Sequence, residues 1–282
     1  MPRSYAPGIV SDQGDPGMSG RTRTRYPAAF STSEGRSQLT MPDTSHLSSK
    51  DIPVDERLIL ALDVPSYDEA MALVDMLGDT VKFYKLGLEL FVSGDYHRLA
   101  DELVARGIHV FADLKMFDVP ITVSRAIERM SKTGIEFVTI HGNEAMLEAA
   151  CAVKGSVKVL AVTVLTSLDE DDMKAMGFKV SIAEVVLSRA YRALAVGCDG
   201  VISSGLEAPE LRKNLGHQFI IVTPGIRPGA NKPDDDQKRT VDVEEAFHNG
   251  ADYIVVGRPI HGATDPKAAA EAIQERIATL FR

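Results

Sequence analysis

From Arg57 onward, apolar runs of strand length alternate with helical patterns, and this alternation occurs eight times. Strands that alternate with helices are typical of a parallel sheet. Eight such units are the number that closes a (β/α)8 TIM barrel. We therefore predict an α/β fold, a parallel eight-stranded barrel over residues 51–282, with strands at 58–64, 81–87, 109–115, 137–142, 157–165, 200–205, 219–225 and 253–258.

Turn and cap residues support the same alternation. Ser66 and Glu69 have the spacing of a capping box at the start of the first helix. A doubly wound open sheet is the alternative, but no Gly-x-Gly-x-x-Gly follows the first predicted strand. Glycines fall where most helices should end, at Gly78, Gly107, Gly134, Gly155, Gly197, Gly216 and Gly250.

Residues 1–50 differ from the rest of the chain. They are rich in Ser, Thr, Gly, Pro and Arg and show no apolar period, so they cannot bury enough surface to offset the entropy of ordering. We predict a disordered N-terminal extension that the barrel does not need. Two alternatives are a transit peptide, for which acidic residues are unusual, and a natural start at Met18 or Met41.

Composition limits the classes of function. The net charge of −9 argues against a general nucleic-acid binder. No apolar run approaches the ~20 residues of a membrane-spanning helix, and no signal-peptide core is present, so we expect no membrane partner. Two cysteines, Cys151 and Cys198, indicate a reducing compartment without a disulfide framework, and we predict a cytoplasmic location.

The end of the third predicted strand carries an unusual group of charges, Asp113-Leu-Lys115-Met-Phe-Asp118-Val-Pro120-Ile-Thr122. Asp113 and Lys115 are two residues apart, so their side chains share one face of the strand. Pro120 has no N–H for further pairing, which places Asp118 in the turn before a helix. An ion pair that merely caps the strand would explain Asp113 and Lys115, but not the residues that follow. We interpret the segment as part of a site.

Barrel enzymes carry their chemistry at the carboxyl ends of the strands. Polar residues occur at this end of nearly every predicted strand. Together they predict a charged pocket lined by Asp63, Lys85, Asp113, Lys115, His141, Thr163, Thr166, Ser167, Ser203, Ser204, Thr223, Arg227 and Arg258.

Two parts of this pocket suit different tasks. Gly257, Arg258 and the turn that carries Arg227 follow strands eight and seven, where many barrels bind phosphate. The long polar segment 228–239 predicts a lid or a connector, from which Gln237 would reach a bound phosphate. In the other half a lysine neighbours each carboxylate, so we expect no metal ion, and we interpret His141 as a packed strand-end residue.

These motifs resemble the orotidine 5′-phosphate decarboxylase family from about Arg57 to the C-terminus. Asp-x-Lys-x-x-Asp alone is shared with phosphosugar decarboxylases and aldolases, whereas the Asp-x-Pro-x-Thr extension is narrower. The family commonly has His and Ile where this chain has Phe117 and Val119. The resemblance rests on Leu60-Ala-Leu-Asp63, Lys85, the segment 113–122, Thr163-Val-Leu-Thr166-Ser167, Thr223-Pro-Gly-Ile-Arg227 and Gly257-Arg258.

The resemblance implies loss of CO₂ from orotidine 5′-phosphate to give uridine 5′-phosphate, with no cofactor and no metal. Asp113 would face the substrate carboxylate, and Lys115 would stabilise and protonate carbon six of the ring. Lys85 and Asp63 would hold the ribose hydroxyls, and Thr166 would contact the pyrimidine.

The resemblance also implies a phosphate site and a homodimer. Asp118 and Thr122 would serve the active site of the second subunit, so each dimer would have shared sites. Pro224 would belong to the substrate site, and the phosphate would be bound by Arg227, Gln237, Gly257 and Arg258.

Three other functions stay open at this point. One is a Mg²⁺-dependent phosphosugar decarboxylase or aldolase, which EDTA would inactivate. Another is a nucleotide-binding barrel without catalytic activity. Such a protein would be expected to lack Lys115, and Lys115 is present in this chain. The last is a nucleic-acid adaptor acting through the Arg-rich N-terminal segment, which the net charge of −9 for the full chain disfavours.

Overall fold

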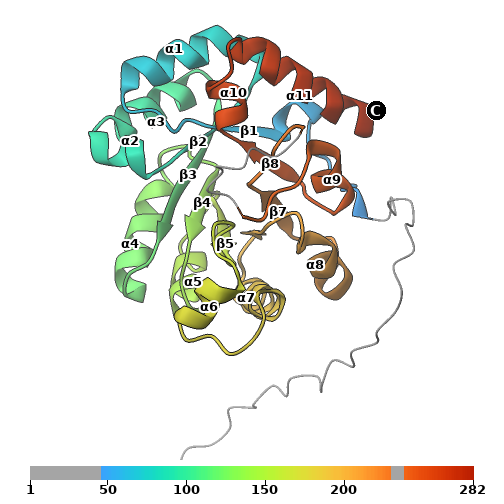
Figure 1. Ribbon diagram of the computed structural model, residues 1–282. Helices are drawn as coiled ribbons and strands as arrows, with labels where there is room; N and C mark the ends of the chain where they lie inside the picture. The colour runs from blue at the N-terminus through green and yellow to red at the C-terminus, as the bar shows by residue number, and fades with distance from the viewer. Residues whose placement is uncertain (1–45, 230–237) are drawn as a thin grey trace, which may run out of the picture. The chain divides into compact units, whose positions relative to one another are not determined.

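The computed structural model describes residues 46–229 and 238–282, and its strands form a closed, all-parallel barrel in chain order (Figure 1). The predicted fold class is confirmed. The strands are β1 (Leu58–Ala61), β2 (Phe83–Leu86), β3 (His109–Met116), β4 (Phe137–Ile140), β5 (Lys158–Val162), β6 (Gly200–Ile202), β7 (Ile220–Thr223) and β8 (Tyr253–Val256).

Helices surround the barrel (Figure 1). In the part of the chain that the structure describes, no helix is long and apolar enough to cross a lipid bilayer. The helices are α1 (Tyr67–Leu77), α2 (Leu88–Ser93), α3 (Tyr96–Ala105), α4 (Pro120–Met130), α5 (Glu144–Cys151), α6 (Glu170–Ala175), α7 (Ile182–Ala195), α8 (Ala208–Leu215), α9 (Val243–His248), α10 (Arg258–His261) and α11 (Pro266–Leu280), with short 3₁₀ turns η2 (Val54–Glu56) and η3 (Gly78–Thr80).

Most strands end earlier than predicted. The apolar pattern continues past the last ladder pair: Leu62, just after β1, is fully buried and its N–H still donates to the carbonyl of Lys85. The prediction therefore followed burial, which outlasts regular pairing at the barrel mouth. β3 is the exception, because it runs to Met116 with a shift of register against β4.

Local cap signals were partly right. All seven glycines predicted at helix ends have positive φ, the conformation that glycine adopts at least cost. Ser66 caps α1 by accepting the N–H of Glu69. The reciprocal half of the predicted capping box is not formed, because the Glu69 carboxylate accepts the Ser66 hydroxyl instead.

An aromatic layer fills the barrel interior. Phe137 packs against Phe83, Phe111 and Tyr253 with ring centroids 4.9, 5.9 and 5.2 Å apart. Side chains two residues apart share a strand face, so the next inward positions on β2 and β3 are Lys85 and Asp113. The charged residues of the barrel mouth thus stand on a rigid apolar floor.

The opposite end of the barrel is held by Asp252, which is fully buried just before β8. Its carboxylate accepts from the Arg212 guanidinium at 2.8 Å and the N–H of Ile221 at 2.9 Å. Ser48 and Lys50 also donate to it, at 2.5 and 3.0 Å. Residues 46–50 therefore contact the barrel, although the predicted extension included them; the rest of that extension, residues 1–45, lies outside the described residues.

Asp252→Asn should lower the free energy of unfolding by about 3–5 kcal/mol, because the Arg212 guanidinium would stay buried without its carboxylate. Urea unfolding at neutral pH measures this change. Asp75→Asn is the matched control, since its ion pair with Arg106 lies in solvent and the unfolding midpoint should hardly move. Equal midpoints for the two variants would show that the Asp252 network does not hold this end together.

Candidate active site

A cavity of about 610 Å³ opens at the carboxyl ends of the strands. Its walls come from residues at or just after β1, β2, β3, β5, β6, β7 and β8, which a closed barrel brings to one mouth. The structure gathers there most of the predicted site residues, namely Asp63, Lys85, Asp113, Lys115, Thr166, Ser167, Pro224, Arg227, Gly257 and Arg258. Four residues predicted to line the pocket are instead buried and do not reach it: Thr163, Ser203, Ser204 and Thr223.

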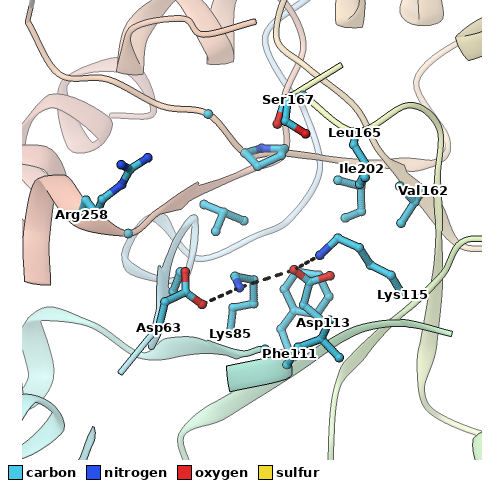
Figure 2. Close-up of a pocket in the computed structure, with 18 of the residues that line it drawn as sticks. Asp63, Lys85, Phe111, Asp113, Lys115, Val162, Leu165, Ser167, Ile202 and Arg258 are labelled. Carbon is cyan, nitrogen blue, oxygen red and sulfur yellow. Dashed lines mark hydrogen bonds and ion pairs between the residues drawn. The ribbon is translucent and has the colours of Figure 1, made fainter. Parts of the chain in front are cut away.

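Four charged side chains form a row of alternating sign along one side of the cavity (Figure 2). The Lys85 ammonium lies 3.2 Å from Asp63 Oδ1 and 3.4 Å from Asp113 Oδ2. The Lys115 ammonium lies 2.9 Å from the same Asp113 oxygen. Asp113 is thus held between two ammonium groups.

Each buried member of the row keeps its neighbour charged. Burial by itself would raise the pKa of Asp113, but the ammonium groups of Lys85 and Lys115 outweigh it and the pKa is lowered. Burial would likewise lower the pKa of Lys85, but the Asp113 and Asp63 carboxylates outweigh it and the pKa is raised. A buried carboxylate and a buried ammonium therefore both persist at neutral pH.

The backbone bends at Lys115 to place this row. Lys115 has φ of +46°, the one positive value among the described non-glycine residues. A non-glycine residue in this region is strained, and such strain collects at functional sites. The N–H of Lys115 donates to Thr139 Oγ1 at 2.9 Å, and the Thr139 hydroxyl donates to Asp113 Oδ1 at 2.9 Å.

Sequence reasoning missed Thr139, which lies under the row on β4. The one feature of the sequence that could have indicated Thr139 is its position two residues after Phe137, which places both side chains on the inward face of β4. Gly87 was also missed: a Cβ there would lie 3.3 Å from Asp63 Oδ1 and 3.4 Å from the Lys85 ammonium. Any side chain at this position would press on the ion pair.

The other wall carries the residues predicted for phosphate. Arg258 lies across the cavity from Lys115 (Figure 2). Gly257 precedes Arg258 on the same wall, where a Cβ would make only ordinary contact with the Cβ of Ala61, at 3.5 Å. His261 also lines this wall. Burial lowers the pKa of His261, and the positive charge of Arg258 lowers it further, so the neutral ring is favoured.

Asp118 and Thr122 do not line this cavity. Asp118 is exposed in the turn before α4, where its carboxylate accepts the N–H of Val119 at 2.6 Å, and Thr122 is exposed on the first turn of that helix. Gln237 lies outside the described residues. The chain that follows it is anchored, because the N–H groups of Lys238 and Arg239 donate to the carbonyl of Thr166.

His141 also stays out of the cavity. Its ring lies 3.4 Å from the Arg189 guanidinium and beside the Phe117 ring, as a packed strand-end residue would. Among residues 46–229 and 238–282, no three His, Cys, Asp or Glu side chains converge as metal ligands.

Comparison with known proteins identifies the family. The model of the orotidine 5′-phosphate decarboxylase / HUMPS family matches residues 56–273. The chain belongs to this family. The orotidine 5′-phosphate decarboxylase of Methylococcus capsulatus is 59% identical over 83% of this chain and 97% of its own length. That of Stenotrophomonas maltophilia is 53% identical over 80% of this chain and 94% of its own length. The family inferred from the motifs is confirmed.

Two solved structures are similar to this chain over most of its length. The orotidine 5′-phosphate decarboxylase of Lactobacillus acidophilus matches with a TM-score of 0.69 and 38% identity, over 79% of this chain and 99% of that chain. An uncharacterized conserved protein of Geobacillus kaustophilus matches with a TM-score of 0.67 and 30% identity, over 78% and 99%.

Thr139→Val should lower kcat about tenfold or more, because Asp113 loses a hydrogen bond and the Lys115 backbone loses its acceptor. Thr163→Val is the matched control: that buried hydroxyl donates to the carbonyl of Ile202 and does not line the cavity. Both variants should lose about 1–3 kcal/mol of stability in urea. An equal kcat for the two variants would show that Thr139 does not position the charged row.

Proposed function

We propose that this chain decarboxylates orotidine 5′-phosphate to uridine 5′-phosphate, the last step of de novo pyrimidine synthesis, with neither a metal ion nor an organic cofactor. The observation that carries the proposal is the row Asp63–Lys85–Asp113–Lys115 facing Arg258 across one cavity. The relatives from Methylococcus capsulatus and Stenotrophomonas maltophilia are both named orotidine 5′-phosphate decarboxylase, which supports the same substrate.

The two walls differ in charge, one with arginines and the other with a row of alternating sign, and this difference suggests how the substrate lies. The phosphate binds at Arg258, Gly257, Arg227 and the Pro224 turn, because a guanidinium offers paired donors to phosphate oxygens. The ring then reaches the charged row, with Thr166 beside the pyrimidine and the ribose hydroxyls at Asp63 and Lys85. The carboxylate of the substrate comes to lie against Asp113.

The chemical step needs only these side chains. The bond between ring carbon six and the carboxylate breaks, CO₂ leaves, and the electron pair stays on carbon six. The ammonium of Lys115 stabilises this charge and gives its proton to the carbon. Asp113 holds that ammonium in place, Lys85 keeps Asp113 ionised from its other side, and solvent then reprotonates the Lys115 amine.

The barrier is high because the electron pair that stays on carbon six has no π-system to receive it. A single ammonium cannot supply the upper part of the ~8–23 kcal/mol that enzymes usually provide. Binding energy from the distant phosphate must therefore contribute to holding the ring against the row.

The direct test follows the loss of ultraviolet absorbance of orotidine 5′-phosphate on adding protein in the presence of EDTA. Turnover that survives EDTA supports the proposal and contradicts the Mg²⁺-dependent alternative. No turnover with or without Mg²⁺ would leave only a nucleotide-binding role.

Lys115→Ala should abolish turnover while the protein still binds uridine 5′-phosphate by calorimetry, because the phosphate wall is untouched. Lys132→Ala removes an exposed ammonium that pairs with Glu128 on α4, and it should keep the wild-type kcat. Residual turnover of Lys115→Ala within tenfold of the wild type would contradict the assigned proton donor.

Arg258→Ala should weaken binding of uridine 5′-phosphate by about 2–3 kcal/mol, the usual loss of a charge-assisted contact. Binding of uridine, which lacks the phosphate, should hardly change. Calorimetry with both ligands measures the difference, and equal losses would mean that Arg258 supports the wall structurally.

We further propose a homodimer in which Asp118 and Thr122 complete the site of the other subunit. Their position outside their own cavity supports this arrangement. The residues around them are apolar yet exposed: Phe117 by 70%, Val119 by 57% and Ile121 by 57%. Large apolar side chains exposed within one short segment are consistent with a protein interface.

Mixing two inactive variants tests the shared site. Lys115→Ala and Asp118→Ala should each be inactive alone, but one site of every mixed dimer would be intact. Random exchange of equal amounts makes about half of the dimers mixed, so activity should rise toward about a quarter of the wild-type value. If activity stays at the sum of the separate variants after proven exchange, Asp118 serves its own chain.

A further inference from the structure

Two free cysteines lie side by side at the end of the barrel away from the cavity. Cys151 ends α5, and Cys198 precedes β6 by two residues. Their sulfur atoms are 3.6 Å apart. The full sequence contains no other cysteine, so the pair comprises every thiol of the chain.

The backbone around the pair is fixed on both sides. The Lys154 ammonium, one turn beyond Cys151, donates to the Gly197 carbonyl at 2.9 Å and to Asp199 Oδ2 at 2.6 Å. The N–H of Cys198 donates to the Ala193 carbonyl at 3.0 Å. Lys154 thus ties the end of α5 to the residues that flank Cys198.

The two thiols differ in access and in acidity. Cys198 is 7% exposed, whereas Cys151 is partly exposed. The hydrogen bond from Cys198 lowers the pKa of Cys151, and the Lys154 ammonium adds to this effect. The same hydrogen bond, together with burial, raises the pKa of Cys198. Thiolates are the reactive form, so a small oxidant meets Cys151 first.

We propose that Cys151 and Cys198 are a redox pair, in which a peroxide oxidises Cys151 and Cys198 closes a reversible disulfide. The Cys151 thiolate attacks one peroxide oxygen, forming a sulfenic acid while the O–O bond breaks and water leaves after protonation. The Cys198 sulfur then displaces the sulfenic hydroxyl, which leaves as a second water with the Cys198 proton. In total two thiols and one hydrogen peroxide give one disulfide and two waters.

The geometry suits this closure. The sulfurs must approach from 3.6 Å to about 2.05 Å, a movement that side-chain rotation and a small backbone shift supply. The cross-link would join α5 to the segment between α7 and β6. Helices α5 and α7 pack beside each other (Figure 1). It encloses β5, α6 and α7, and a long closed loop is the kind that a disulfide stabilises most.

Hydrogen peroxide titration of the full chain tests the proposal. The thiol count under denaturing conditions should fall from two to none, the monomer mass should drop by about 2 Da, and dithiothreitol should restore both thiols. The melting temperature of the oxidised protein should rise by roughly 5 °C or more.

Single variants identify the order of events. Cys198→Ser should accumulate a dimedone-reactive sulfenic acid at Cys151, because no resolving thiol remains, and Cys151→Ser should stay unlabelled at the same peroxide dose. Each variant should fold, since serine differs from cysteine by one atom and neither residue lines the cavity.

Two thiols that survive the peroxide in the wild type would overturn the proposal, and so would one surviving thiol beside a sulfenic acid, because Cys151 would then react without being resolved by Cys198. Covalent dimers in place of the monomer that is about 2 Da lighter would also overturn it. These measurements read thiols and mass, so their outcome is independent of the proposed decarboxylase activity.

Discussion

The burial of Asp113 between two ammonium groups is the interaction on which the site depends. A carboxylate taken out of water at this depth is costly unless it is paired and hydrogen-bonded. Lys85, Lys115 and the Thr139 hydroxyl supply those partners, at 3.4, 2.9 and 2.9 Å. The bend at Lys115 and the aromatic layer below help to hold these groups in one place.

Buried charges have different roles at the two ends of the barrel. The amino end is closed by Asp252, whose carboxylate is fully buried and fully used by structural donors such as Arg212 and the N–H of Ile221. The carboxyl end keeps its charges facing an open cavity. The same type of group, a buried carboxylate beside cations, therefore supports stability at one end and chemistry at the other.

Much of this was readable in the sequence. Apolar runs in alternation with helical patterns, repeated eight times, predicted the barrel, and the rule that chemistry collects at carboxyl ends predicted most of the charged residues in the cavity wall. The spacing of Asp113 and Lys115 predicted their contact. The strand ends were overestimated because burial continues where pairing stops, as Leu62 shows.

The sequence by itself determined the repeat, the polar strand ends and the family, because periodicity and motif spacing are local properties of the chain. Only the tertiary structure decided that Thr139 supports the row, that Gly87 leaves room for the Asp63–Lys85 pair, and that Cys151 meets Cys198. These contacts join residues from different strands and helices. Their register is set when the barrel closes, and no local pattern records it.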